Sequence, residues 1–261
     1  MRVTALTVYP LKGARGVPVA ASAVEPRGLR GDRRWMLADA DGRFLSQRTH
    51  PRLALMRATL LAAGLRLDAP GMPPLEVPVP PPDAPRRRVQ LWSSVLEAPL
   101  AETGGAWLRE ALGTDAQLVY MDESLRRPVD PDFAVGDALV SFADGYPLLL
   151  TTTASLADLN ARLDAPVSMQ RFRPNVVIEG AAPFEEDGWG RIRVGEVELH
   201  VVKPCARCAV PAVDPETGAV GKEPLKTLAT YRRWAGKVYF GQNVIPAGEG
   251  RMHVGDRVEV L

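Results

Sequence analysis

The sequence predicts a mostly β (α+β) fold, with an N-terminal β-barrel-like domain followed by a second β-barrel domain that carries a few helices. Short stretches rich in Val, Leu and aromatic residues recur along the 261 residues, and Gly, Pro and Asp-Gly turns separate them. Only three stretches have apolar residues at helical spacing. The length allows two modest domains, which we place at residues 1–120 and 121–261.

The first domain begins at once with a predicted strand, Val3–Tyr9, and a second strand candidate follows at Val17–Val24. Trp35–Ala38 and Phe44–Ser46 flank an Asp-Gly pair, which suits the tight turn of a hairpin. Leu53–Leu67 is apolar and interrupted by Ala-Ala-Gly, so we expect a strand, a turn and another strand.

The rest of this half contains a proline-rich stretch. Ala69–Pro85 favours an extended connector or an edge strand, because proline cannot donate a hydrogen bond inside a sheet. Val89–Pro99 is predicted as a strand. Leu100–Leu112 is predicted as a helix, since its leucines and Trp107 fall on one face.

The second half contains two predicted helices among strands. Ala154–Leu163 has helical spacing, and the threonines at 151–153 can cap its start. Lys222–Tyr231 is the other helix, with Pro224 near its first turn. The predicted strands are Asn175–Ile178, Ile192–Val194, Val197–Val202 and Arg257–Leu261.

Charge and hydropathy exclude some classes of function. The chain has 32 basic and 31 acidic residues, a net charge of +1, which argues against a nucleic-acid groove. No apolar stretch reaches the roughly 18 residues of a membrane span. The N-terminus lacks the features of a signal peptide, so we expect a cytoplasmic protein without a structural disulfide.

Cys205 and Cys208 are the only cysteines, and they can form a disulfide, a redox motif, half of a zinc site, or one ligand with a neighbour. A zinc site needs a second ligand pair, but the three histidines do not lie at ligand spacing from one another. A thioredoxin-type pair should open a helix, whereas prolines and a glycine follow here.

The remaining interpretation is a thiolate in a loop at the end of a strand. Arg207 beside Cys208 would favour the thiolate form electrostatically. The alternative is a buried cysteine that packs as a small apolar residue. The residue chemistry alone leaves these two interpretations open.

The sequence around the cysteines resembles the MOSC domain, the C-terminal domain of molybdenum-cofactor sulfurases. The matching motifs lie at 203–208 (Lys-Pro-Cys-Ala-Arg-Cys), 213–218, 223–228 and 240–243. Residues 8–13, 31–35 and 47–52 resemble the N-terminal β-barrel domain that accompanies it, and residues 154–160 and 171–175 match as well. The resemblance therefore covers nearly the whole chain.

The resemblance implies a molybdenum-cofactor-binding oxidoreductase that reduces small N-hydroxylated substrates. In this family the second cysteine of the pair binds the molybdenum of a molybdopterin cofactor, so Cys208 is the implied metal ligand and catalytic residue, and Cys205 is its neighbour. The implied cofactor-binding residues are Lys12, Gly13, Arg33, Thr152, Thr153, Arg173, Asn175, Arg207 and Cys208. Gly13 departs from the serine that the family often has there.

We expect neither zinc nor an iron–sulfur cluster in this chain, because a [2Fe–2S] cluster needs four ligands. The electrons would then come from a separate electron-transfer protein. Two other functions stay open: a carrier that transfers the molybdenum cofactor or sulfur to another enzyme, and a β-barrel whose thiol has only a structural role.

Overall fold

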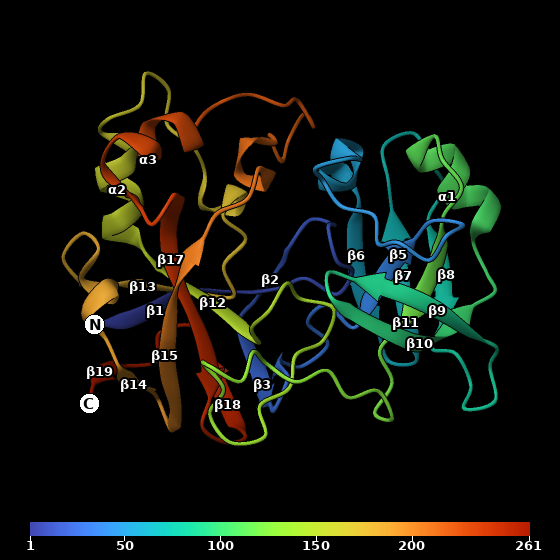
Figure 1. The fold of residues 1–261 in the computed structure, drawn as a ribbon, viewed down its shortest axis with the longest axis horizontal. Coiled ribbons are helices and arrows are strands. Elements are labelled where there is room, and N and C mark those ends of the chain that lie inside the picture. The colour runs from blue at the N-terminus through green and yellow to red at the C-terminus, as the bar shows by residue number, and fades with distance from the viewer.

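The computed structural model describes residues 1–261 and has two lobes (Figure 1). The small lobe, on the right in Figure 1, contains residues 35–120. The large lobe, on the left, contains both chain termini and most of the second half of the sequence. Strands dominate both lobes and only three α-helices occur, which confirms the mostly β prediction.

The small lobe consists of two antiparallel sheets with two clusters of buried apolar residues. The four-stranded sheet has the order β5-β11-β10-β9 and the three-stranded sheet the order β6-β7-β8. Trp35, Leu37 and Leu65 belong to the larger cluster, and Met36 and Val119 belong to the smaller one. The elements are β5 (Trp35–Ala38), β6 (Arg57–Leu61), β7 (Gly64–Asp68), β8 (Leu75–Pro78), β9 (Arg86–Leu91), β10 (Ser94–Ala101), α1 (Gly105–Leu112) and β11 (Gln117–Tyr120).

The large lobe is built on a nine-stranded sheet. Eight of its strands have the order β19-β14-β15-β17-β12-β13-β1-β2, and the ninth, β16, pairs with β17. Its strands are β1 (Arg2–Val8), β2 (Val17–Val19), β12 (Leu148–Thr152), β13 (Val176–Glu179), β14 (Arg191–Val194), β15 (Val197–Ala206), β16 (Arg233–Trp234), β17 (Lys237–Pro246) and β19 (Val258–Val260). A second sheet contains β18 (Gly250–His253), β3 (Ala21–Glu25) and β4 (Gly28–Leu29). The helices are α2 (Thr153–Asn160) and α3 (Leu225–Tyr231).

The start of the chain belongs to the large sheet. β1 pairs antiparallel with β13 and with β2, and Val3, Leu6 and Val8 are buried in the large-lobe core. The division at residues 120 and 121 stays a prediction, and the hydrogen-bonded sheets do not follow it over the first 29 residues. None of the three helices combines the length and the apolar character that crossing a bilayer requires.

Three predicted elements differ from the structure. Val17–Val24 is not one strand but is divided between β2 and β3, which belong to different sheets. Val89–Pro99 is not one strand, because β9 and β10 form a hairpin that turns at Trp92 and Ser93. The helix predicted from Leu100 begins only at Gly105, since residues 100 and 101 still belong to β10 and Gly104 has a left-handed φ of 103°.

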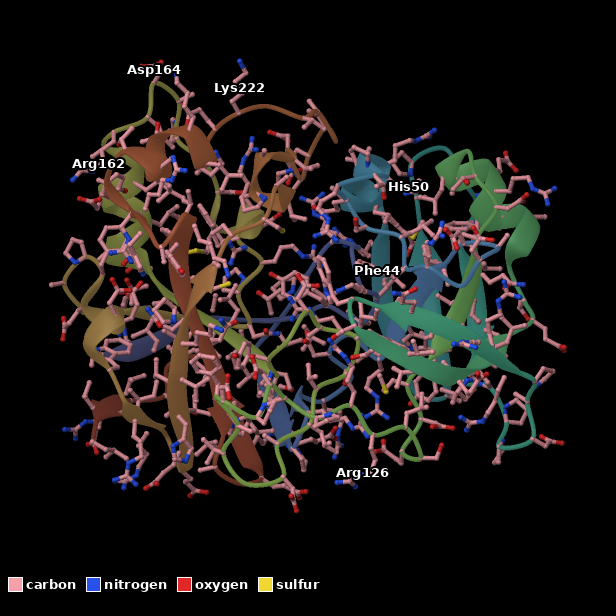
Figure 2. The ribbon with its side chains drawn as sticks, in the orientation of Figure 1. Phe44, His50, Arg126, Arg162, Asp164 and Lys222 are labelled. Carbon is pink, nitrogen blue, oxygen red and sulfur yellow. The ribbon has the colours of Figure 1, made fainter.

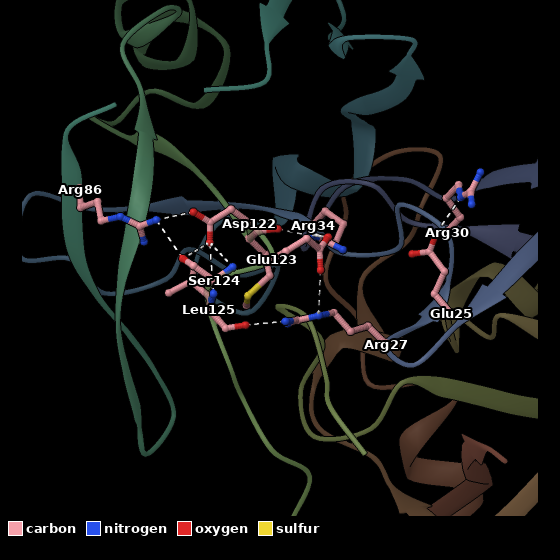
Figure 3. A network of polar contacts seen from close by, with 10 residues as sticks. Glu25, Arg27, Arg30, Arg34, Arg86, Asp122, Glu123, Ser124 and Leu125 are labelled. Carbon is pink, nitrogen blue, oxygen red and sulfur yellow. Dashed lines mark hydrogen bonds and ion pairs between the residues drawn. The ribbon is translucent and has the colours of Figure 1, made fainter. Parts of the chain in front are cut away.

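A segment between the lobes, residues 121–147, is fixed by arginines from both lobes (Figure 3). Arg34 donates to the carbonyl of Met121 at 2.8 Å and to the carboxylate of Glu123, and Arg27 donates to the carbonyl of Leu125. Arg86 contacts Asp122 and Ser124. These contacts hold the connecting segment in one path as it returns to the large lobe.

Candidate functional site

A cavity of about 880 Å³, counting the open space at its mouth, lies where the two lobes meet. It collects residues from segments far apart in the sequence, mostly from turns and loops. Phe44, labelled in Figure 2, marks the side of the cavity that faces the small lobe. The residues that carry its chemistry are Lys12, Arg33, Phe44, Arg48, Asp144, Arg173, Asn175, Cys205, Arg207 and Cys208.

The charge of the lining is strongly positive. The lining contains five cationic side chains, Lys12, Arg33, Arg48, Arg173 and Arg207, and its only carboxylate belongs to Asp144. Such a surplus in a partly closed space favours an anionic ligand. Arginine forks also suit phosphate oxygens and flat hydrogen-bonding rings.

The two cysteines have different surroundings. Both are free and half-buried. Cys205 lies within β15, and its sulfur accepts a hydrogen bond from Arg207 at 3.1 Å. Burial raises the pKa of the Cys205 thiol, although the Arg207 guanidinium opposes this shift. Cys208 lies beyond the end of the strand, on the wall of the cavity.

Arg33 and Arg173 share an unusual backbone conformation. Their φ angles are 48° and 58°, in the left-handed region that residues with a Cβ seldom adopt. Both guanidinium groups lie over the ring of Tyr9, at 4.3 and 4.4 Å from its centroid. Burial raises the pKa of Tyr9 to about 12 despite these two cations. Such backbone strain is concentrated at functional sites, where surrounding contacts maintain it.

Asn175 holds Arg33 in place rather than pointing a free amide into the cavity. Its oxygen accepts from Arg33 at 2.9 Å and from the amide of Leu149 at 3.2 Å. Its nitrogen donates to the carbonyl of Thr7 at 3.1 Å and to Asp32 at 3.0 Å. Since both the oxygen and the nitrogen of the amide form hydrogen bonds within the protein, the geometry of Asn175 fits a role in positioning Arg33.

Arg173 and Arg207 are also tied to backbone carbonyls. Arg173 donates to Ala14 at 2.6 Å, and burial lowers its pKa to about 10. Arg207 donates to Phe172 at 2.8 Å, while its buried Nε has no partner in the protein. A buried donor without a partner is costly, so an acceptor on a bound ligand would stabilise it.

Lys12 and Asp144 form an ion pair across the cavity, with Nζ 2.5 Å from Oδ1. Burial lowers the pKa of Lys12, and Asp144 opposes that shift. Burial also acts to raise the pKa of Asp144, but Lys12 and a hydrogen bond from Trp92 outweigh it and hold the pKa of Asp144 well below its usual range. The Asp144 carboxylate is therefore ionised at neutral pH.

Thr152 and Thr153, expected at the cofactor, do not line the cavity. Thr152 caps α2 by accepting from the amide of Ser155 at 3.1 Å, as its sequence position predicted for a cap. Its hydroxyl also lies 3.1 Å from the carboxylate of buried Glu186, which contacts Ser155 as well. The start of this helix is thus occupied by side chains of the protein itself.

The structure adds residues that the sequence did not suggest. Asp144, Phe44 and Arg48 line the cavity, and Trp92 reaches it from the β9–β10 hairpin. The one available signal was the motif at residues 47–52, which contains Arg48. The stretch around Trp92 was predicted as one continuous strand, and Asp144 lies in a segment without periodicity.

Comparisons with known proteins identify related families and proteins. The sequence model of the family described as MOSC domain matches residues 137–259, and that of the MOSC N-terminal beta barrel domain matches residues 1–115. The chain is 36% identical to mitochondrial amidoxime-reducing component 1 of Danio rerio, over 98% of this chain and 83% of that protein.

Two further relatives support the same assignment. Mitochondrial amidoxime reducing component 2 of Rattus norvegicus is 35% identical over 88% of this chain and 72% of its own length. Mitochondrial amidoxime-reducing component 1 of Homo sapiens is 33% identical over 99% and 82%. Among solved structures, the YuaD protein from Bacillus subtilis covers 98% of this chain, but its TM-score of 0.46 and identity of 11% are too low for any inference.

Proposed function

Because the chain belongs to the MOSC domain family and carries its N-terminal β-barrel domain, we propose that it is a molybdenum-cofactor-dependent reductase of N-hydroxylated substrates. The observation that carries the proposal is the free Cys208 on the wall of a cavity with five cationic side chains. The names of the relatives, amidoxime-reducing components, support the type of substrate.

The metal-binding side chains of the chain fit a metal whose other ligands belong to a cofactor. The chain has no group of three or more His, Cys, Asp or Glu side chains that could hold a metal ion. A single thiolate is nevertheless suited to a soft metal centre whose other ligands belong to a cofactor. The Cys208 thiolate would thus be the one protein ligand.

The remaining residues would hold the organic part of the cofactor. Lys12, Arg33 and Arg173 would bind its phosphate and pterin, and the unpartnered Nε of Arg207 would gain an acceptor. Asn175 would act through Arg33, and the backbone at Gly13 would replace the serine hydroxyl of the family. When bound, the cofactor would supply the two-electron chemistry.

The net reaction converts an N-hydroxyl group to N–H and water. The N–O bond breaks, two protons and two electrons are consumed, and the oxygen leaves as water. The electrons would come from a separate electron-transfer protein, since the two cysteines of this chain are too few for a [2Fe–2S] cluster. The chain would orient the substrate and keep the cofactor in one position.

Metal analysis of the purified protein tests the proposal. Protein from a host that makes molybdopterin should contain stoichiometric molybdenum and pterin, and it should reduce benzamidoxime with an artificial electron donor. Cys208→Ala should lose the metal and the activity. Cys205→Ala, the matched control, should keep most of the metal because Cys205 would be a neighbour and not a ligand.

Two outcomes would contradict the proposal in different ways. Wild-type protein without molybdenum, or equal retention in Cys208→Ala, would reject the metal site. A protein that binds the cofactor, does not reduce benzamidoxime and passes the cofactor to an apo-enzyme would instead be a carrier.

A further inference from the structure

Trp92 occupies a position that a purely structural tryptophan would seldom take. It lies in the turn between β9 and β10, with a left-handed φ of 55°, and 43% of it is exposed. Turns of this kind favour Gly, Asn or Asp. A large aromatic residue held here in a strained conformation, at the edge of the cavity, suggests a binding role.

Three aromatic and cationic groups form a wall at this edge. The Trp92 ring lies 5.3 Å from the ring of Phe44, tilted by 54°. The guanidinium of Arg48 lies over both rings, 4.4 Å from the Trp92 centroid and 5.6 Å from that of Phe44. Phe44 and Arg48 line the cavity, and Trp92 lies outside its lining but packs against both, so the wall, defined as Phe44, Arg48 and Trp92, extends outward from the cavity.

A carboxylate lies directly beside the wall. The indole Nε1 of Trp92 donates to Oδ1 of Asp144 at 3.2 Å, and the same oxygen contacts Nζ of Lys12. These contacts set the position of the aromatic surface relative to an ionised acceptor. A planar ring on the wall would therefore place an attached N–H group close to the carboxylate.

On the basis of the proposed function, we infer that Phe44 and Trp92 determine specificity for aryl amidoximes. The aromatic ring of the substrate stacks on the wall, and the amino group of the amidoxime donates to Asp144. Aromatic pairs gain energy beyond the area they bury, and an amino group bound to a carboxylate fixes the orientation. Substrates without a ring would lack the first contact.

Two substrates with the same amidoxime group test this assignment. Benzamidoxime carries a phenyl ring, and acetamidoxime carries a methyl group in its place. In the molybdenum-loaded enzyme, Trp92→Ala should lower the ratio of kcat/KM for benzamidoxime to kcat/KM for acetamidoxime by about tenfold, mainly through KM. Trp92→Phe should restore most of the ratio.

Trp234 provides the matched control. It is similarly exposed, at 41%, but the neighbours of its ring, Tyr239 and Arg232, do not line the cavity. Trp234→Ala should leave the ratio unchanged. Equal losses for both substrates in Trp92→Ala, or no change in the ratio, would overturn the inference while the proposed function stands.

Binding without turnover separates the inference from the proposed function. Benzamidoxime added in the absence of an electron donor should quench tryptophan fluorescence in the wild type and in Trp234→Phe, but much less in Trp92→Phe. Undiminished quenching in Trp92→Phe would reject the wall. If the wild-type protein takes up no molybdenum in a host that makes molybdopterin but still shows quenching that depends on Trp92, the reductase is rejected and the aryl-binding wall is retained.

Discussion

At the scale of single residues, Arg127 stabilises the backbone segment that carries Asp144. It is 6% exposed, and its guanidinium donates to the carbonyls of Ser141, Ala143 and Asp144 at 2.8, 2.5 and 2.7 Å. Burial lowers its pKa to about 10. Its Nε also donates to the hydroxyl of Ser94 at 3.2 Å. The backbone that carries Asp144 thus depends on a buried arginine that donates to three of its carbonyls.

Replacement of Arg127 should loosen this backbone. Arg127→Met leaves three carbonyls without their donor, so we expect the free energy of unfolding to fall by about 2–3 kcal/mol, measured by urea denaturation. Arg126→Met is the control, since Arg126 is the exposed neighbour labelled in Figure 2, and its change should stay within about 0.5 kcal/mol. Equal losses in both variants would show that the carbonyl contacts contribute little.

The sequence predicted most residues of the site but not what each contacts. The resemblance suggested Lys12, Arg33, Arg173 and Cys208, and these meet in the cavity. It did not predict that the amide of Asn175 would be used within the protein, because the partners are a backbone carbonyl, a backbone amide and side chains that packing brings together. Such contacts depend on strand register, which no local pattern specifies.

At the scale of elements, the strands missed from the sequence lack a clear period. β17 crosses the middle of the large sheet, but its interior contains Gly241, Gln242 and Asn243, and it ends at Pro246. Gln242 is buried and donates to Asp187 at 2.6 Å. Buried polar residues with tertiary partners obscure the alternation that identifies a strand. The turn at Trp92 and Ser93 was missed because it contains none of the Gly, Asn or Asp residues that mark a two-residue hairpin turn.

The start of α2 carries a buried acid that should make stability depend on pH. Burial raises the pKa of Glu186 above its ordinary value of 4.5, and hydroxyl contacts from Ser155 and Thr152 oppose the shift. A raised pKa in the folded state means that the stabilisation is complete below pH 4.5 and is lost as pH rises through the folded-state pKa.

Glu186→Gln should remove this dependence, since an amide has similar shape and does not ionise. Relative to wild type, the variant should become progressively more stable as the pH rises from 4.5 toward 7.5, measured by urea denaturation at each pH. Glu185→Gln removes a neighbouring exposed carboxyl and controls for the change in net charge. A constant difference between Glu186→Gln and wild type at every pH would contradict the assignment.

At the scale of the whole molecule, the site exists only because the two lobes pack together. Phe44 and Arg48 come from the small lobe, whereas Cys205 and Cys208 come from the end of β15 in the large lobe. The segment with Asp144 runs between the lobes. Sequence patterns report the period of one element at a time, so a site assembled from three separate segments gives no local signal.

The large lobe also depends on the beginning of the chain. β1 is hydrogen-bonded on both sides, to β13 and β2, and Val3, Leu6 and Val8 contribute to the core. A chain that begins at residue 121 would expose the edge of β13 and leave a gap in this core. Unpaired edges and exposed apolar surface favour aggregation.

We therefore predict that residues 121–261 do not fold when expressed alone. The fragment should give no cooperative thermal transition by circular dichroism, because it lacks β1 and β2 of the large sheet, β3 and β4 of the second sheet, and five core side chains, Val3, Leu6, Val8, Val24 and Leu29. Co-expression with residues 1–120 should restore a soluble complex with a single transition, since the missing strands are then supplied by the second chain. A control fragment pair divided within the exposed residues 81–83 would cut the small lobe instead and leave β1 bound to its neighbours. A cooperative transition for residues 121–261 alone would show that the large-lobe sheet is stable without β1.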